Sequence, residues 1–135
     1  MLEDNKYITT ESLHDGNLVV MTAKDFSNPA VDAWAEQVKA YKDSRGVSPT
    51  RYIVYDFSQV NVGISSYARQ RTIELAEADR QATGRVAIVL STDTITRHVF
   101  NMFINTFSRR RQPYLTVKLF SDRAEAIQWV EESMP

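Results

Sequence analysis

The stretch from Tyr52 to Gln70, YIVYDFSQVNVGISSYARQ, changes from strand-like to helix-like character over a short distance. Its first residues are β-branched and aromatic, a composition that favours strands. Asp56 and Ser58 follow where that strand should end, and the paired serines Ser65 and Ser66 stand where the helical pattern begins. Serine is among the best residues for capping a helix N-terminus. The stretch therefore predicts one strand-loop-helix unit of an α/β domain.

The same alternation of strand and helix patterns extends in both directions along the chain. Asp15-Gly16 suits a tight hairpin turn between the first two strands. The later strands alternate with helices, which implies right-handed crossovers and a parallel sheet. We therefore predict an α/β fold of order ββαβαβαβα, with a mixed five-stranded sheet that starts with an antiparallel hairpin, and with four helices. The expected strands cover 6–13, 18–24, 51–57, 85–91 and 114–120, and the expected helices cover 27–46, 65–84, 93–110 and 121–133.

Composition limits the classes of function. The chain has 135 residues, enough for one domain over residues 1–135, and its net charge of -1 creates no field that would attract nucleic acid. It has no cysteine, and its two histidines lack metal-ligand spacing, so we expect no metal site and no cofactor. The N-terminus does not resemble a signal peptide, and no apolar run reaches the ~20 residues needed to span a bilayer. We expect a cytoplasmic protein without a membrane span.

Four polar residues should gather near the carboxyl ends of the parallel strands, where ligands of open α/β sheets bind. Asp56 and Ser58 follow a strand, and Ser65 and Ser66 begin the next helix. Free N–H groups and the helix dipole favour negative charge at a helix N-terminus, including that of a phosphoserine. The sequence leaves two interpretations of Ser65 open: a helix cap, or part of a site.

The motif around these residues resembles the STAS family, the fold of anti-sigma-factor antagonists, and its divergent SpoIIAA-like branch. The quoted matches are YDFSQVNVGISSYA, VAIVLSTDTITRHVFNMF and LTVKLFSDRAEAIQWV. The family motif reads Asp-Leu-Ser-Gly-Val, three residues, then Asp-Ser-Ser-Gly-Leu, and the paired serines fall in register with it. The resemblance implies phosphorylation of Ser65 and a protein partner such as a kinase or an anti-sigma-like protein. Ile64 and Tyr67 depart from the family's aspartate and glycine, and Gly63 replaces an apolar residue.

The helix expected over 93–110 has more apolar residues than one buried stripe requires. Ile95, Val99, Met102, Phe103 and Thr106 centre on one direction, whereas Phe100 lies off that centre and Ile104 lies nearly opposite. These two side chains need a partner. It is a neighbouring element, a second copy of the chain, or an apolar ligand, for which Met102 is a further candidate wall residue. We predict a homodimer with Phe100 and Ile104 at or near its contact.

Together these patterns predict a non-enzymatic regulatory or protein-interaction module, with no catalytic residue, whose surface near Ser58, Ser65 and Ser66 meets a partner. The first alternative is a carrier of a small apolar, lipid-like ligand, because folds related to the STAS family include lipid carriers of the CRAL-TRIO-like type. The second alternative is a weak hydrolase that uses Ser65 as its nucleophile.

Overall fold

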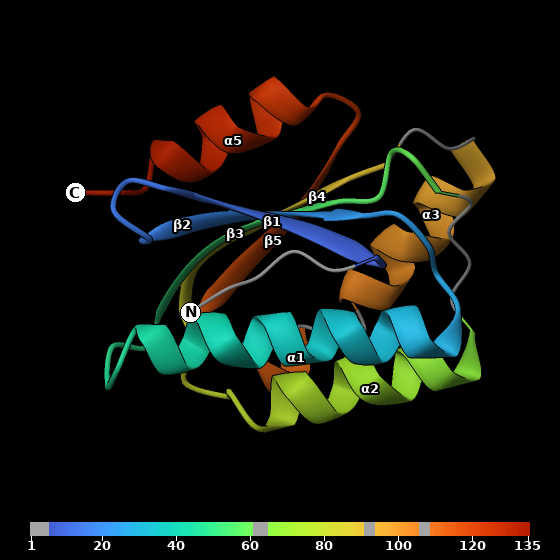
Figure 1. The fold of residues 1–135 in the computed structure, drawn as a ribbon, viewed down its shortest axis with the longest axis horizontal. Coiled ribbons are helices and arrows are strands. Elements are labelled where there is room, and N and C mark those ends of the chain that lie inside the picture. The colour runs from blue at the N-terminus through green and yellow to red at the C-terminus, as the bar shows by residue number, and fades with distance from the viewer. Residues whose placement is uncertain (1–5, 61–64, 91–93, 106–108) are drawn as a thin grey trace.

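A five-stranded mixed sheet forms the centre of the molecule in the computed structural model, which describes residues 6–60, 65–90, 94–105 and 109–135 (Figure 1). The chain order ββαβαβαβα is confirmed, with one short additional helix. The elements are β1 (Ile8–Leu13), β2 (Leu18–Ala23), α1 (Asn28–Ser44), β3 (Thr50–Asp56), α2 (Ser66–Glu77), β4 (Thr83–Val89), α3 (Thr94–Phe103), α4 (Arg109–Arg111), β5 (Leu115–Phe120) and α5 (Arg123–Glu131).

The strands lie in the sheet in the order in which they occur in the chain, β1-β2-β3-β4-β5. β1 and β2 form the predicted antiparallel hairpin, and β2 to β5 are parallel. The carboxyl ends of four strands therefore lie along one edge of the sheet.

The described part of the chain forms one more helix than the four predicted. The helix expected over 93–110 is present as α3 and as the separate short α4, and residues 106–108 between them lie outside the described part of the chain. The apolar repeat continues across this boundary, so periodicity alone predicts one long helix.

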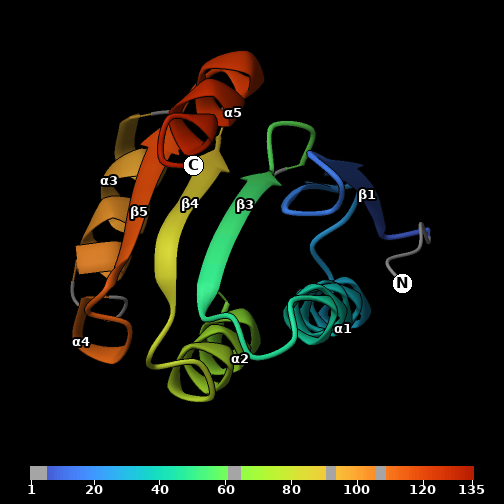
Figure 2. The same ribbon diagram turned by 90° about the vertical axis from the view of Figure 1, so that its left-hand side faces the viewer.

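The two faces of the sheet are covered differently (Figure 2). α5 packs directly on β3, β4 and β5, and its Ala126 and Val130 join Val54, Ala87 and Val89 in a fully buried cluster. α1 and α2 lie side by side across the opposite face, and α3 lies beside β4 and β5 (Figures 1 and 2). In the described part of the chain, no helix is long and apolar enough to cross a membrane.

The start of β4 requires a glycine. Gly84 has a φ of +98°, and it pairs with Arg51 of the neighbouring strand. A Cβ atom at Gly84 would lie 2.1 Å from the carbonyl oxygen of Arg51. This contact is backbone, so rotation of a side chain cannot relieve it.

We expect Gly84→Ala to lower the free energy of unfolding by about 3 kcal/mol or more, because it adds a backbone clash to an unfavourable φ. Gly46→Ala is the matched control, since Gly46 also has a positive φ, +63°, but has open space around it. Its loss should stay near 1–2 kcal/mol. Urea unfolding of the two variants measures the difference, and equal losses would contradict the proposed clash.

Candidate functional site

Asp56 and Ser58 form a local hydrogen-bonded unit at the carboxyl end of β3. The backbone N–H and the hydroxyl of Ser58 donate to Oδ1 of Asp56 over 2.9 and 2.6 Å. The other carboxylate oxygen of Asp56 accepts from Nη1 of Arg123 over 3.1 Å, and Asp56 is only 2% exposed. The buried charge of Asp56 is therefore paired and hydrogen-bonded, as a buried carboxylate requires.

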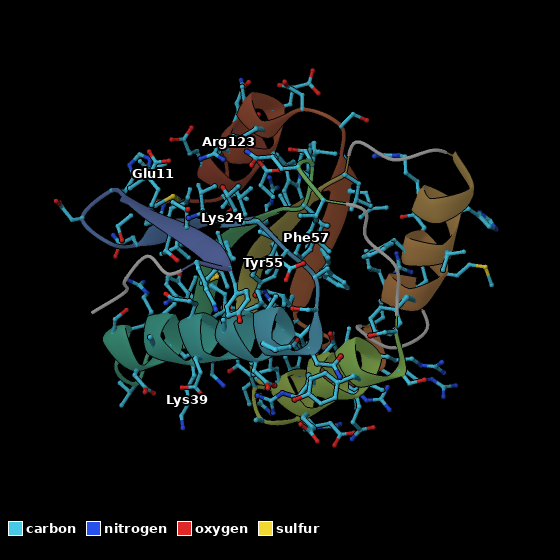
Figure 3. The ribbon with its side chains drawn as sticks, turned by 45° about the vertical axis from the view of Figure 1, so that its right-hand side comes forward. Glu11, Lys24, Lys39, Tyr55, Phe57 and Arg123 are labelled. Atoms are coloured by element: carbon cyan, nitrogen blue, oxygen red, sulfur yellow. The ribbon has the colours of Figure 1, made fainter. Side chains whose placement is uncertain are left out.

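Arg123 extends this unit into a network between four elements. Its guanidinium also donates to the hydroxyl of Thr22 over 2.8 Å and to the carboxylate of Glu11 over 3.0 Å. Figure 3 labels Arg123 and Glu11. The network joins α5 to β1, β2 and β3. Sequence reasoning missed Arg123, because no local pattern indicates a contact with Asp56, which lies 67 positions earlier in the chain.

Ser65 has the position that the sequence predicts for it. It is the N-cap of α2, where its hydroxyl accepts from the backbone N–H of Ala68 over 3.0 Å. Ser65 and Ser66 are both exposed. The structure confirms that Asp56 ends the third strand and that Ser65 begins a helix. The departures from the family motif at Gly63 and Ile64 lie outside the described residues.

Tyr67, another departure from the family motif, joins the starts of α1 and α2. Its hydroxyl donates to the carboxylate of Asp32 in α1. This hydrogen bond raises the pKa of Tyr67, and a smaller contribution comes from desolvation. The Tyr67 side chain therefore holds the two helices together.

The prediction of which side of α3 is buried was wrong. Phe100 and Ile104, expected to stand off the buried face, are each 7% exposed, whereas Val99 and Met102 are 45% and 56% exposed. The helix turns its off-centre residues inward because Phe57, Leu90 and Leu119 offer them an apolar surface. Their own chain thus covers both Phe100 and Ile104, so neither is available for the dimer contact proposed for them. The oligomeric state itself stays a prediction.

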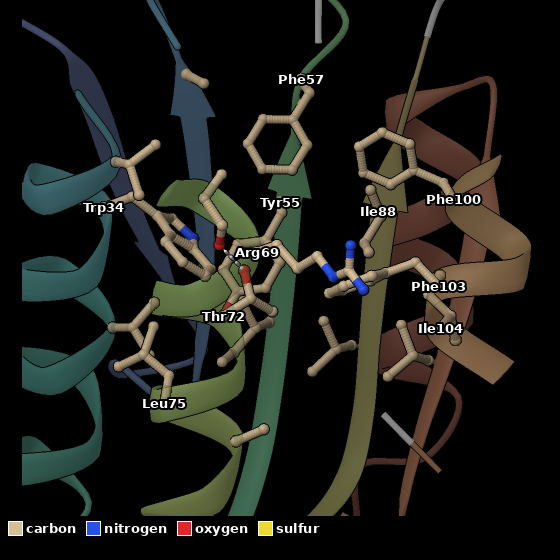
Figure 4. Close-up of a pocket in the computed structure, with 18 of the residues that line it drawn as sticks. Trp34, Tyr55, Phe57, Arg69, Thr72, Leu75, Ile88, Phe100, Phe103 and Ile104 are labelled. Atoms are coloured by element: carbon tan, nitrogen blue, oxygen red, sulfur yellow. Dashed lines mark hydrogen bonds between the residues drawn. The ribbon is translucent and has the colours of Figure 1, made fainter. Parts of the chain in front are cut away.

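Phe100 and Ile104 line an apolar cavity of about 170 Å³. The cavity lies between the sheet and α1, α2 and α3 (Figure 4). Two of the three residues predicted as walls of a ligand pocket, Phe100 and Ile104, are walls of this cavity, and the exposed Met102 is not. Seven aromatic side chains contribute to the wall: Tyr7, Phe26, Trp34, Tyr55, Phe57, Phe100 and Phe103.

These aromatic rings support one another around the cavity. Tyr55 packs against Trp34 at a centroid distance of 5.5 Å and against Phe57 at 6.3 Å. Phe57 in turn meets Phe26 edge-to-face at 5.7 Å. Such edge-to-face and offset contacts are the preferred geometries of aromatic pairs. The wall is therefore a connected aromatic lining with a defined shape.

The cavity exists because α2 is anchored at its ends and has small side chains along the face between them. Ala68, Thr72 and Ala76 line the cavity together with Leu75 and leave space above the sheet. At the C-terminal end of α2, Arg51 of β3 forms two hydrogen bonds of 2.9 Å with the carboxylate of Asp79. At the other end of α2, the Tyr67 hydroxyl is hydrogen-bonded to α1. Helix α2 therefore covers the cavity, and we call it the roof of the cavity.

The mainly apolar wall of the cavity also contains polar and charged side chains. Arg69 of α2 and Tyr55 of β3 both line it. Burial raises the pKa of Tyr55, so its phenol stays protonated and able to donate throughout the physiological range. The indole N–H of Trp34 is buried and has no hydrogen-bond partner within the described part of the chain.

The described residues contain no cluster of three or more histidine and acidic side chains that could hold a metal ion. The hydroxyl of Ser65, the nucleophile of the hydrolase alternative, is engaged as the acceptor that caps α2. Ser65 is also absent from the lining of the cavity.

Comparison with known proteins gives no independent assignment: no protein-family model, no curated protein and no solved structure matches this chain. The site must therefore be interpreted from its own geometry.

The cap at Ser65 can be tested by two substitutions. Ser65→Ala should lower the free energy of unfolding by about 1 kcal/mol, because the N–H of Ala68 loses its acceptor. Ser65→Asp should stay within about 0.5 kcal/mol of the wild type, because aspartate also caps and complements the helix dipole. Ser66→Ala, at the exposed first position of α2, is the control and should change little. Urea unfolding would contradict the cap if both substitutions at position 65 were equally destabilising.

Proposed function

We propose that this protein is a non-enzymatic binding module for a small apolar ligand, which occupies the cavity beneath α2. The observation that carries this proposal is a hollow of about 170 Å³ between three helices and the sheet, with seven aromatic side chains in its wall. An engineered apolar cavity of ~150 Å³ stays dry and binds benzene. Pockets for drug-sized molecules start at ~300 Å³. The ligand is accordingly about the size of one aromatic ring with a short substituent.

The energetic cost of the hollow supports a functional role. At ~24 cal/mol per Å³, a closed empty cavity of about 170 Å³ would cost the fold about 4 kcal/mol of stability, which is the upper limit for a hollow that is partly open to solvent. This is a large fraction of the typical stability of a domain, ~5–15 kcal/mol. One larger side chain in place of Ala68 or Ala76 would fill part of the space. A ligand that fills the cavity restores the lost contacts, which couples binding to stability.

A second proposed function, which can coexist with the first, is regulation through a protein partner, as in the STAS family that the sequence resembles. The exposure of Ser65 and Ser66 at the start of α2 supports it, because a partner or a kinase has access to both. Ser58 is less favoured as a modification site, since its hydroxyl already donates to Asp56. α2 also forms the roof of the cavity, so ligand occupancy and partner binding would act on the same helix.

The phosphorylation part of this second function has a direct test. Mass spectrometry of the protein from its native cells should find phosphate on Ser65 in preference to Ser58 or Ser66. Ser65→Asp, which keeps the cap, should alter partner binding while the domain stays folded. Phosphate found only at other residues would reduce Ser65 to a helix cap.

Ligand binding can be tested by filling the cavity from the sheet. Ile88 of β4 lines the cavity next to Phe57, Phe100 and Phe103 (Figure 4). In a close-packed core, Ile88→Phe would cost about 1–3 kcal/mol through overpacking. In a hollow it should cost less than ~1 kcal/mol, because the added ring occupies empty space.

The same variant should no longer bind toluene or indole, whereas the wild type should bind them and unfold at a higher temperature in their presence. Val99→Phe is the matched control, since it adds a ring on the exposed side of α3, away from the cavity lining. Calorimetric titration and thermal unfolding measure both effects. The proposal fails if the wild type binds neither probe, or if Ile88→Phe binds them as well as the wild type does.

A further inference from the structure

The uncharged polar side chains in the cavity wall indicate the chemical class of the ligand, an inference that rests on the proposed function. Tyr55 of β3 and Trp34 of α1 lie next to each other in the wall, with ring centroids 5.5 Å apart. In Figure 4 Trp34 lies on the side of α1, Tyr55 extends from β3, and the labelled side chains of α3 lie on the opposite side. The cavity therefore has one side with polar groups on its rings and one side that is apolar.

The hydroxyl of Tyr55 is a donor that the fold leaves available for a ligand. The hydroxyls of Tyr41 and Tyr67 donate to the carbonyl of Asn17 and to the carboxylate of Asp32, whereas no hydrogen bond of the Tyr55 hydroxyl occurs in the described part of the chain. Burial is the largest cause of the raised pKa of Tyr55. The phenol therefore stays protonated and able to donate.

The other uncharged polar side chains in this part of the wall support a ligand that accepts a hydrogen bond. The indole N–H of Trp34 is a second buried donor, and it has no acceptor among the described residues. Thr72 and Gln112 use their donors within the fold: the Thr72 hydroxyl donates to the carbonyl of Ala68 over 2.7 Å, and the Gln112 amide donates to that of Asp79 over 3.1 Å. A buried donor without an acceptor is costly, so an acceptor on the ligand complements this wall.

We propose that the cavity binds a neutral aryl ketone, with the ring inside the aromatic wall and the carbonyl oxygen accepting from the hydroxyl of Tyr55. The volume of about 170 Å³ accommodates one ring with a short substituent, which aromatic walls hold edge-to-face or offset. A carbonyl is satisfied by one donor and brings no charge into an apolar cavity, where burying a charge is costly. The contact is assigned to Tyr55 because the indole nitrogen of Trp34 is enclosed by neighbouring atoms.

The experiment compares two ligands of nearly equal size, acetophenone and ethylbenzene, which differ only in the carbonyl oxygen. Tyr55→Phe removes the hydroxyl and keeps the ring in the wall. The affinity of this variant for acetophenone should be about tenfold lower than that of the wild type, because the carbonyl loses its donor. Its affinity for ethylbenzene should stay within about twofold of the wild type. Calorimetric titration measures all four affinities.

Two further measurements separate a contact with the ligand from a structural effect. In the infrared spectrum, the C=O stretching band of bound acetophenone should lie at lower frequency in the wild type than in Tyr55→Phe, because a hydrogen bond weakens the carbonyl bond. Tyr55→Phe should unfold at no lower temperature than the wild type, since it breaks no hydrogen bond in the described part of the chain. Tyr114→Phe is the matched control: Tyr114 is exposed and does not line the cavity, so both affinities should be unchanged.

The outcomes separate this inference from the proposed function. An acetophenone affinity that survives Tyr55→Phe, equal losses for the two ligands, or the same C=O frequency in both proteins would overturn the aryl ketone while an apolar-ligand site stands. A lower unfolding temperature of Tyr55→Phe would show that the hydroxyl has a partner within the fold, and would also overturn it. If acetophenone does not bind the wild type, the inference fails, and the toluene and indole titrations then decide the proposed function independently.

Discussion

The ion pair between Arg51 and Asp79 fixes the position of α2 above the sheet. Both carboxylate oxygens of Asp79 accept from the guanidinium of Arg51 over 2.9 Å, and both side chains are largely buried. Removing one partner of such a pair leaves an uncompensated buried charge, which costs about 3–5 kcal/mol. Because Arg51 belongs to β3 and Asp79 follows α2, the pair sets how closely this end of the helix approaches the strands. The cavity depends on that spacing.

Charged side chains have different structural roles on the two faces of the sheet. On the α5 face, Arg123 pairs with Asp56 above a close-packed cluster, so helix and sheet are in direct apolar contact. On the opposite face, α2 is tied at its ends, to α1 through Tyr67 and to β3 through Asp79, and its middle carries small side chains. The first arrangement produces a core and the second produces a hollow with an aromatic lining.

Placing the ligand beneath α2 connects the two proposed functions physically. The helix that forms the roof of the cavity begins at Ser65, whose hydroxyl caps it, and it carries Arg69 one turn later. A ligand that fills the cavity would contact α2 along its inner face, and a partner or phosphate at Ser65 would act at its exposed start. Changes at either place bias the same structural element, which is the requirement for coupling between them.

The stretch from Tyr52 to Gln70 by itself determined the local unit of strand, loop and capped helix, and similar local signals determined the element order and the mixed sheet. These features depend on residues close in sequence: β-branched runs, the Asp15-Gly16 turn and the cap at Ser65. Only the tertiary structure decided which side of α3 is buried, because apolar residues occur around most of that helix and the surface that receives it comes from distant strands. It alone also decided the cavity and the role of Arg123, since a hollow and a contact over 67 residues arise from spacing between elements that no local pattern encodes.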